Sequence, residues 1–210
     1  MNAVQKFDIT QRMSEVNELM ERTDNPLHWA ILNNYVRHAI LELCNEWRQI
    51  VTPDMMVPHP TYRFHEAAGL RVLDGIEAVC AEYESYARRG IAVIYHTEGR
   101  IEVGDYGFLT EFVQKRFWPG QEIVKLGDVV DDLDATYLVS ITQMSCWTYD
   151  DQARLIEERV YRGRDRTVRK CHPDEVISSE ECRSKLMPLL PPAANPANAM
   201  RIREQMRSKA

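Results

Sequence analysis

The pattern of apolar and polar residues divides the chain into a helical first part and a later part rich in strands. In residues 8–22 apolar side chains recur every three or four positions, which predicts a short amphipathic helix. A longer helix is predicted over residues 25–47, with Asn25 as its cap and Pro26 at the favoured first helical position. The wide apolar arc of this helix, which includes Tyr35, predicts burial on more than one side.

Two further segments precede a change of periodicity. Residues 55–65 contain Pro58 and Pro60, which have no backbone N–H, so this segment is expected to be an edge strand or an extended cover segment. Asp74 and Glu77 have the spacing of a capping box, which predicts a helix that starts at Asp74 and ends at Gly90.

From residue 91 onward, apolar and polar residues alternate with the period of a β-strand. Four strands are predicted between turn sequences, over residues 91–97, 107–118, 135–148 and 153–162. Helices followed by antiparallel hairpins predict an α+β fold, in which helices cover the concave face of a strongly curved antiparallel sheet and leave a conical cavity. We expect an N-terminal helical extension over residues 1–24, a main domain over residues 25–187, and a proline-rich linker with a basic tail over residues 188–210.

Composition narrows the classes of protein that fit this pattern. The 210 residues carry 26 Lys and Arg against 32 Asp and Glu, and a net charge of −6 argues against a nucleic-acid partner. No apolar run reaches the roughly 18 residues of a membrane helix, and residues 1–10 lack the apolar core of a secretory signal. Five cysteines without a C-x-x-C pair are expected to be reduced thiols in a cytoplasmic protein.

Motifs that bind nucleotides or metals are absent from the sequence. It contains no G-x-G-x-x-G, Walker A or G-x-S-x-G motif, and its six histidines form no H-E-x-x-H pattern. We therefore expect neither a metal nor a cofactor. The chemistry that remains is proton transfer and hydrogen bonding by side chains.

The proline-stiffened segment is the first candidate for such chemistry. Strand alternation places His59 and Tyr62 on opposite sides, and both are candidate acid–base residues. A nearby cation would lower the pKa of the Tyr62 phenol. Arg71, Lys115 or Arg116 could stabilise a developing oxyanion. An ordinary polar surface loop is the alternative for this segment.

Other candidates lie on the long helix and the strands. Tyr35 is expected either to face the cavity or to pack in the core, and His38 to point outward or to cap. Glu111 and Lys115 share a strand face with apolar residues, which indicates a cavity-lining group, a buried ion pair or an interface between subunits.

Aromatic residues and one acidic residue at a strand border complete the set of candidates. Asp105 borders the strand predicted over residues 107–118. The indoles of Trp118 and Trp147 would favour a flat aromatic substrate if they face the cavity.

Four local sequences, in this order along the chain, resemble those of the nuclear transport factor 2-like superfamily. They are Leu32-Asn33-Asn34-Tyr35, the polar extended segment from Val57 to Phe64, the D-G-x-E-A-V sequence from Asp74 to Val79, and the last strand from Arg154 to Tyr161. The resemblance covers residues 25–165. The superfamily includes the polyketide cyclases, ketosteroid isomerase, scytalone dehydratase and limonene epoxide hydrolase. It implies a cone-shaped fold, pairing of two chains through the outer sheet face, and an acid near Asp105.

In size and in its aromatic residues the chain also resembles the bacterial diarylpropane lyases. This resemblance implies a cofactor-independent lyase that acts on a hydrophobic hydroxylated aromatic compound, such as a lignin-derived diarylpropane, and releases formaldehyde. Two alternatives stay open: a steroid or polyketide isomerase or cyclase with Asp105 as the base, and a non-catalytic protein that binds a hydrophobic ligand. A homodimer is expected in each case, with no nucleic-acid or membrane partner.

Overall fold

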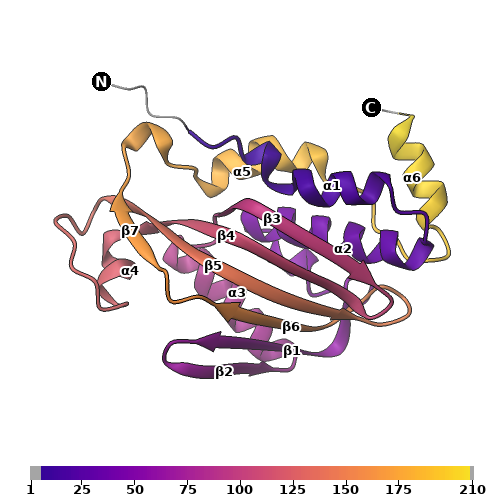
Figure 1. The fold of residues 1–210 in the computed structure, drawn as a ribbon, viewed down its shortest axis with the longest axis horizontal. Helices are drawn as coiled ribbons and strands as arrows, with labels where there is room; N and C mark the ends of the chain where they lie inside the picture. Colours follow the sequence, from indigo (N-terminus) through magenta and orange to yellow (C-terminus); the bar gives the residue numbers. More distant parts are fainter. Residues whose placement is uncertain (1–5, 209–210) are drawn as a thin grey trace.

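The computed structural model describes residues 6–208, which form one curved sheet with helices packed against it (Figure 1). The chain begins with a 3-10 helix η1 (Ile9–Met13), followed by α1 (Ser14–Glu21), α2 (Pro26–Leu43) and a second 3-10 turn η2 (Trp47–Gln49). Asn25 caps α2 as predicted, because its side chain accepts hydrogen bonds from the N–H groups of Leu27 and His28. The helix ends at Leu43 rather than at Trp47.

Within residues 6–208 seven strands form the sheet. A strand lies at each of the four predicted places, but the one predicted over residues 91–97 begins at Ile94 and continues to Gly104. The strands are β1 (Met56–Glu66), β2 (Gly69–Asp74), β3 (Ile94–Gly104), β4 (Gly107–Pro119), β5 (Thr136–Tyr149), β6 (Leu155–Arg162) and β7 (Thr167–Lys170). Their order is β2-β1-β6-β5-β4-β3, and β7 pairs with the first part of β5. Helix α3 (Ile76–Arg89) connects β2 to β3, and the short α4 (Gly120–Val124) follows β4.

The position of β1 differs from the prediction of an edge strand. β1 lies between β2, which takes the edge, and β6, with which it pairs in parallel. The ladders leave out Pro58 and Pro60, since the pairing with β6 is interrupted between Met56 and Thr61 and the pairing with β2 begins at Thr61. An interior strand tolerates both prolines because no ladder hydrogen bond needs their missing N–H groups.

The start of α3 also differs from the predicted capping box. The helix begins at Ile76 with Gly75 at its cap position, where no side chain accepts a hydrogen bond from the helix. The carboxylate of Asp74 instead lies 3.0 Å from Nε2 of His59.

The C-terminal segments form a second helical layer on the outer side of α2 (Figure 1). They are the helices α5 (Ser179–Leu186) and α6 (Ala199–Arg207), both of which contact α2. The 3-10 turn η3 (Pro173–Glu175) precedes α5, and η4 (Met187–Leu189) follows it. In the expected linker and basic tail, α6 packs on α2 and buries Ala199 and Ile202. Residues 1–5 of the expected extension, and Lys209 of the tail, lie outside the described residues. Layers on both sides of α2 explain its wide apolar arc.

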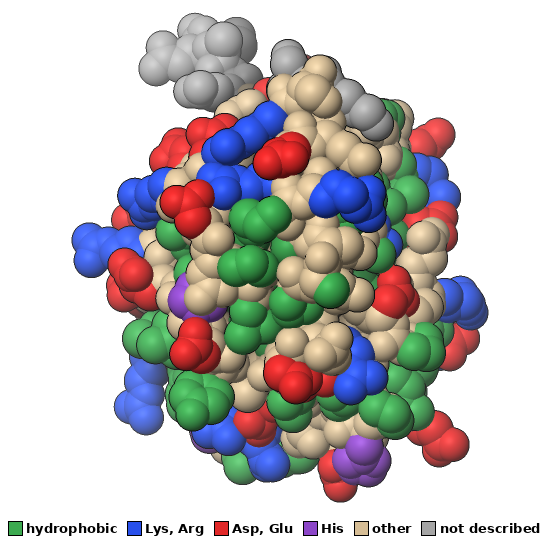
Figure 2. Space-filling view, turned by 90° about the vertical axis from the view of Figure 1, so that its right-hand side faces the viewer, with side chains coloured by type: hydrophobic (Ala, Val, Ile, Leu, Met, Phe, Trp, Pro, Cys, Tyr) green, Lys and Arg blue, Asp and Glu red, His purple; other side chains and the backbone are tan. Residues whose placement is uncertain are grey.

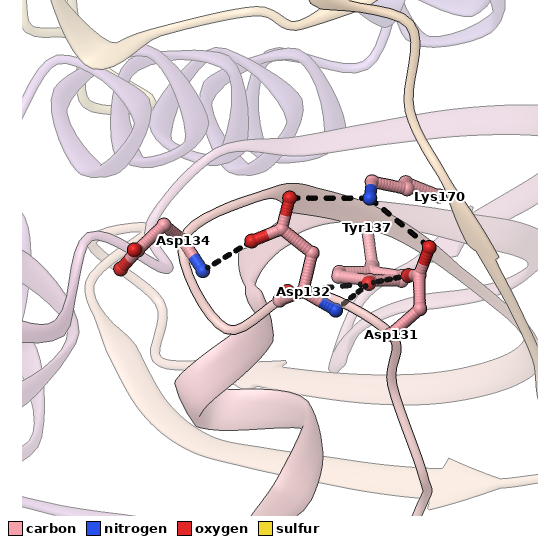
Figure 3. A network of polar contacts seen from close by, with 5 residues as sticks. All are labelled: Asp131, Asp132, Asp134, Tyr137 and Lys170. Atoms are coloured by element: carbon pink, nitrogen blue, oxygen red, sulfur yellow. Dashed lines mark hydrogen bonds and ion pairs between the residues drawn. The ribbon is translucent and has the colours of Figure 1, made fainter.

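A polar network fixes the acidic segment between α4 and β5 (Figure 3). Lys170 of β7 lies 3.1 Å from a carboxylate oxygen of Asp131 and 3.2 Å from one of Asp132. The phenol of Tyr137 donates a 2.5 Å hydrogen bond to Asp131. Asp131 and Asp132 are thus paired within the fold, and the network anchors the segment to β5 and β7.

The surface combines charged and apolar side chains. On the face that forms the right-hand side of Figure 1, hydrophobic side chains gather near the middle and charged ones surround them (Figure 2). None of the helices within residues 6–208 combines the length and apolar character that a membrane crossing needs.

Candidate active site

A cavity of about 50 Å³ lies between the concave face of the sheet and the helices α2 and α3. A water molecule needs on the order of 10–15 Å³ of such volume, so this cavity has room for a few waters or a very small molecule. Its lining is unusually rich in charge. Three arginines and three glutamates contribute to it: Arg12, Arg116, Arg162, Glu42, Glu82 and Glu158.

The strand register brings one row of side chains together on this concave face. Parallel pairing of β1 with β6 sets Tyr62 beside Glu158, and antiparallel pairing of β6 with β5 sets Glu158 beside Trp147. Phe108 of β4 continues the row next to Trp147. Side chains on adjacent strands at paired positions share a face, and Tyr62, Glu158 and Trp147 of this row line the cavity.

A chain of three hydrogen-bonded side chains connects this wall to the helices. The Tyr83 hydroxyl on α3 lies 2.9 Å from the Tyr62 hydroxyl and 2.7 Å from Nε2 of His38 on α2. All three side chains are buried and line the cavity. The other ring nitrogen of His38, Nδ1, has no hydrogen-bond partner among the described residues.

Burial sets the protonation of this chain. It raises the pKa of both Tyr62 and Tyr83 well above that of a free phenol, and the Glu158 carboxylate raises the pKa of Tyr62 further. Burial, assisted by the positive charge of Arg12, lowers the pKa of His38 to about 3. The phenols and the imidazole are therefore neutral at physiological pH. The predicted lowering of the Tyr62 pKa by a cation is wrong, because burial dominates.

Glu158 is the carboxyl group with the most strongly altered pKa in the cavity. Burial, assisted by the negative charge of Glu42, raises the pKa of Glu158 to about 8. Burial also raises the pKa of Glu42, whose carboxylate lies 4.0 Å from Nε2 of His38. The Glu158 side chain is half-buried and lines the cavity. A carboxyl group with a pKa near neutral pH is suited to general acid–base catalysis.

Four of the residues singled out from the sequence line this cavity and are buried. They are Tyr62, Tyr35, Trp147 and Arg116, the last of which was one of the three candidates for stabilising an oxyanion. Tyr35 packs against Trp147 with ring centroids 5.2 Å apart, and Trp147 meets the His38 ring edge-on at 4.8 Å. Alternation along β1 is confirmed, since Tyr62 points inward and His59 outward.

The other predicted acid–base and oxyanion residues lie elsewhere. The His59 side chain is 72% exposed on the opposite side of β1. Arg71 pairs with Glu82 at 3.0 Å and stacks over Phe64, and the Lys115 ammonium lies 3.5 Å from the Ser140 hydroxyl on the outer face. The structure therefore does not place His59, Arg71 or Lys115 beside Tyr62.

The remaining candidates are also outside the cavity. Asp105 lies in the β3–β4 turn, where its side chain is 76% exposed and 2.8 Å from His28. Glu111 is exposed on the outer sheet face opposite Met144. Trp118 is buried in a separate apolar cluster near α4.

Several cavity residues were missed by the sequence interpretation. His38 is 1% exposed and does not point outward, as expected from the sequence. Tyr83 lies on the apolar stripe of the predicted third helix, which was a usable signal for burial. The sequence carries no signal that Arg12 or Glu158 is buried, because a charged residue in a short helix or among other charged residues is normally exposed to solvent. Within residues 6–208, no group of three or more His, Cys, Asp or Glu side chains is arranged to hold a metal ion.

Comparisons with known proteins support the fold. No family model and no curated protein matches the chain. A structure from Jannaschia sp. CCS1, assigned as a SnoaL-like polyketide cyclase, is 15% identical with a TM-score of 0.50 and covers 67% of this chain and 90% of its own.

Two further solved structures have lower scores. The epoxide hydrolase/cyclase-like enzyme SalBIII of salinomycin pyran-ring formation is 15% identical, with a TM-score of 0.43 and coverage of 66% and 93%. An NTF2-like protein with a cystatin-like fold from Novosphingobium aromaticivorans is 12% identical, with a TM-score of 0.35 and coverage of 75% and 92%. The sheet, its covering helices and the likeness to the Jannaschia structure show that the chain has the α+β fold of the nuclear transport factor 2-like proteins.

Proposed function

We propose that this protein is a cofactor-independent enzyme that moves a proton at a carbon next to a carbonyl group, in an isomerase or cyclase type of reaction. The observation that supports it is Glu158, a carboxyl group with a pKa raised to about 8, beside Tyr62 on the wall of the cavity. A base that titrates near neutral pH and a neutral hydrogen-bond donor are the two groups that enolisation requires.

In this mechanism the Glu158 carboxylate takes the proton from the carbon. The electron pair of the broken C–H bond forms a C=C bond, and the carbonyl oxygen becomes the enolate oxygen. The Tyr62 hydroxyl donates a hydrogen bond to that oxygen and keeps its own proton, since its pKa is far above neutral. Return of the proton from Glu158 to another carbon completes an isomerisation. In a cyclisation the enolate carbon attacks a second carbonyl carbon, and the alkoxide formed there takes the proton back from Glu158.

Tyr83 and His38 orient the Tyr62 hydroxyl. With the proton of His38 on Nε2, the imidazole donates to Tyr83, and Tyr83 donates to Tyr62. This direction leaves the Tyr62 proton for the substrate and leaves Nδ1 of His38 as a bare acceptor. Each donor in the chain strengthens the next, so the enolate receives a more polarised hydrogen bond.

A lyase reaction on a diarylpropane uses the same residues but fits the cavity less well. Loss of a hydroxyl group β to a carbonyl begins with the same removal of a proton from the carbon next to the carbonyl group. The proposed site could therefore also catalyse a dehydration. Sites for drug-sized ligands, however, measure roughly 300–1,000 Å³, and the cavity measures about 50 Å³. Two aromatic rings would require the cavity wall to move.

Proton exchange in deuterated water tests the proposal before the net reaction is known. The protein is incubated with a panel of small ketones, keto esters and keto acids, and NMR follows the replacement of hydrogen by deuterium beside the carbonyl group. We expect catalysed exchange in at least one compound and a loss of about 10–10³-fold in Tyr62→Phe, because one oxyanion donor is removed.

Tyr106→Phe is the matched control for this experiment, since Tyr106 is 85% exposed in the β3–β4 turn. The control should exchange as fast as the wild type. Binding of panel compounds without any exchange would contradict the proposed function. That outcome would favour a second candidate, a protein that binds a hydrophobic ligand, which an apolar pocket of about 440 Å³ between α1, α2, α5 and α6 supports.

We also propose that two chains pair through the outer face of the sheet. Leu109 on β4, Met144 on β5 and Tyr161 on β6 are exposed there by 56%, 52% and 44%, and Met144 and Tyr161 are direct neighbours. An apolar area of this kind favours association with a second copy. Sedimentation should give about twice 24.4 kDa, and Met144→Glu should sediment as a monomer. A wild-type monomer at micromolar concentration would contradict the pairing.

A further inference from the structure

Two arginines on the cavity wall carry their charges without an acidic partner. Arg12 and Arg116 are each 7% exposed, and within residues 6–208 neither has an Asp or Glu oxygen within 4.0 Å. The third cavity arginine, Arg162, forms an ion pair with Glu66. A buried charge is costly unless a group of opposite charge accompanies it. The two unpaired guanidinium groups therefore indicate that an anion belongs in this cavity.

The contacts of Arg12 are all to neutral groups. Its Nε donates to the backbone oxygen of Ile94 at 3.1 Å, Nη2 lies 3.4 Å from Nε2 of His96, and Nη1 lies 2.6 Å from the sulfur of Met13. These contacts hold the guanidinium in place and leave its charge uncompensated. The residue comes from η1, so the segment before α2 contributes directly to the cavity.

Arg116 reaches the same wall from β4. Its register partner on β3 is Ile94, the residue whose carbonyl oxygen holds Arg12. Its Nε donates to the side-chain oxygen of Gln114 at 2.6 Å, which is again a neutral partner. His96 lies on the same wall, and burial together with the charges of both arginines lowers its pKa. Two cations thus flank one region of β3, with a neutral imidazole beside them.

The acidic side chains of the cavity do not compensate these charges at close range. Glu82 pairs with Arg71, which is not among the residues that line the cavity. Glu42 and Glu158 face the cavity, but neither carboxylate comes within 4.0 Å of Arg12 or Arg116. Burial also raises the pKa of Glu158 to about 8, so at neutral pH its negative charge is incomplete. The cavity therefore keeps a positive balance on the side of Arg12 and Arg116.

We infer that Arg12 and Arg116 bind the carboxylate group of the substrate, which makes the substrate class small oxo acids. Guanidinium groups are well matched to carboxylates, to which they donate paired hydrogen bonds. The volume of about 50 Å³ limits the acid to a few heavy atoms, as in pyruvate. The inference rests on the proposed function for the reaction, but the anion site itself stands on the two unpaired arginines.

Titration calorimetry tests the site with acetate and pyruvate against the neutral molecules of similar size, acetamide and acetone. We expect saturable binding of the two carboxylates, at least about tenfold tighter than that of the neutral molecules. Arg12→Gln and Arg116→Gln should each weaken binding of pyruvate by about 10–100-fold, because a charge-assisted hydrogen bond is lost. Arg88→Gln, which changes an exposed arginine on α3, is the control and should leave the affinity unchanged.

Thermal unfolding supplies a second readout that does not depend on affinity. Without an added anion, Arg116→Gln should melt at or above the wild-type temperature, since it removes an unpaired buried charge. Addition of pyruvate should raise the melting temperature of the wild type only. Equal affinity for pyruvate and acetone, or a marked fall in the melting temperature of Arg116→Gln, would overturn the inference.

The two proposals fail in different ways. Catalysed deuterium exchange in neutral ketones, without preferential binding of carboxylates, would remove the anion site and keep the proposed function. Tight binding of pyruvate that depends on Arg12 and Arg116, without exchange in any oxo acid, would keep the site and remove the function.

Discussion

Glu158→Gln is expected to slow proton exchange by about 10²–10⁴-fold and to make the protein more stable at alkaline pH. The loss of activity follows from the removal of the base. The gain in stability has a separate cause, since burial disfavours the charged carboxylate and raises its pKa to about 8. Because glutamine is neutral at every pH, the variant does not have to bury that charge.

The direction of the pH dependence follows from the two protonation states. Between about pH 4.5 and 8 the folded protein holds a proton on Glu158 that the unfolded chain releases. The free energy of unfolding of the wild type therefore falls as pH rises, by up to about 1.4 kcal/mol per pH unit from this group. Across the whole range the variant should gain on the order of 3–5 kcal/mol relative to the wild type. His38 and His96 have lowered pKa values in the wild type, and both residues are kept in the variant, so we expect their contributions to largely cancel in this difference.

Urea denaturation of both proteins at about pH 5, 6, 7 and 8 measures this difference. Glu157→Gln is the matched control, since Glu157 is the neighbouring residue on β6 but pairs with Arg63 and Arg159 on the other face. Those pairs lower the pKa of Glu157, so the control should be slightly less stable than the wild type, with no growing difference above about pH 6. A stability difference for Glu158→Gln that stays constant with pH would show that its pKa is not raised.

The fold class follows from periodicity, and the missed elements are those that periodicity cannot reveal. Alternation identified β4, β5 and β6 because some of their inward positions, such as Phe108, Trp147 and Val160, are apolar and buried. β2 pairs only with β1 at the sheet edge, so both its faces are largely exposed and its residues do not alternate clearly. The interior position of β1 was missed because proline is excluded from interior strands only where its backbone nitrogen would have to donate a ladder hydrogen bond. Pro58 and Pro60 lie outside the paired positions of β1.

The candidate site was only partly predictable, for a related physical reason. Alternation assigns Tyr62 and His59 to opposite faces but does not say which face is concave. Tyr62 and Glu158 are neighbours only through the parallel pairing of β1 with β6, which connects distant parts of the sequence. The role of Arg12 depends on η1 folding back onto β3. These contacts are tertiary, and local patterns carry no record of them.

Gly107→Ala is expected to be among the most destabilising single-methyl changes in the chain. Gly107 opens β4 after the two-residue turn and has φ of +134°, a conformation that side chains rarely adopt. A Cβ atom there would overlap the backbone oxygen of Trp147 and come 2.9 Å from its carbonyl carbon. These are main-chain atoms of the adjacent strand, so β4 and β5 must separate locally.

We expect a loss of roughly 2–4 kcal/mol in the free energy of unfolding, from the strained backbone and the overlap together. The change should also alter tryptophan fluorescence, because Trp147 packs on Phe108 and His38 at the cavity wall. Gly104→Ala is the matched control: it lies at the other end of the same turn, and its added Cβ would meet nothing within 4 Å. The control should stay within about 0.5 kcal/mol of the wild type. Equal stability of the two variants would show that β4 and β5 are not as close at Trp147 as the structure has them.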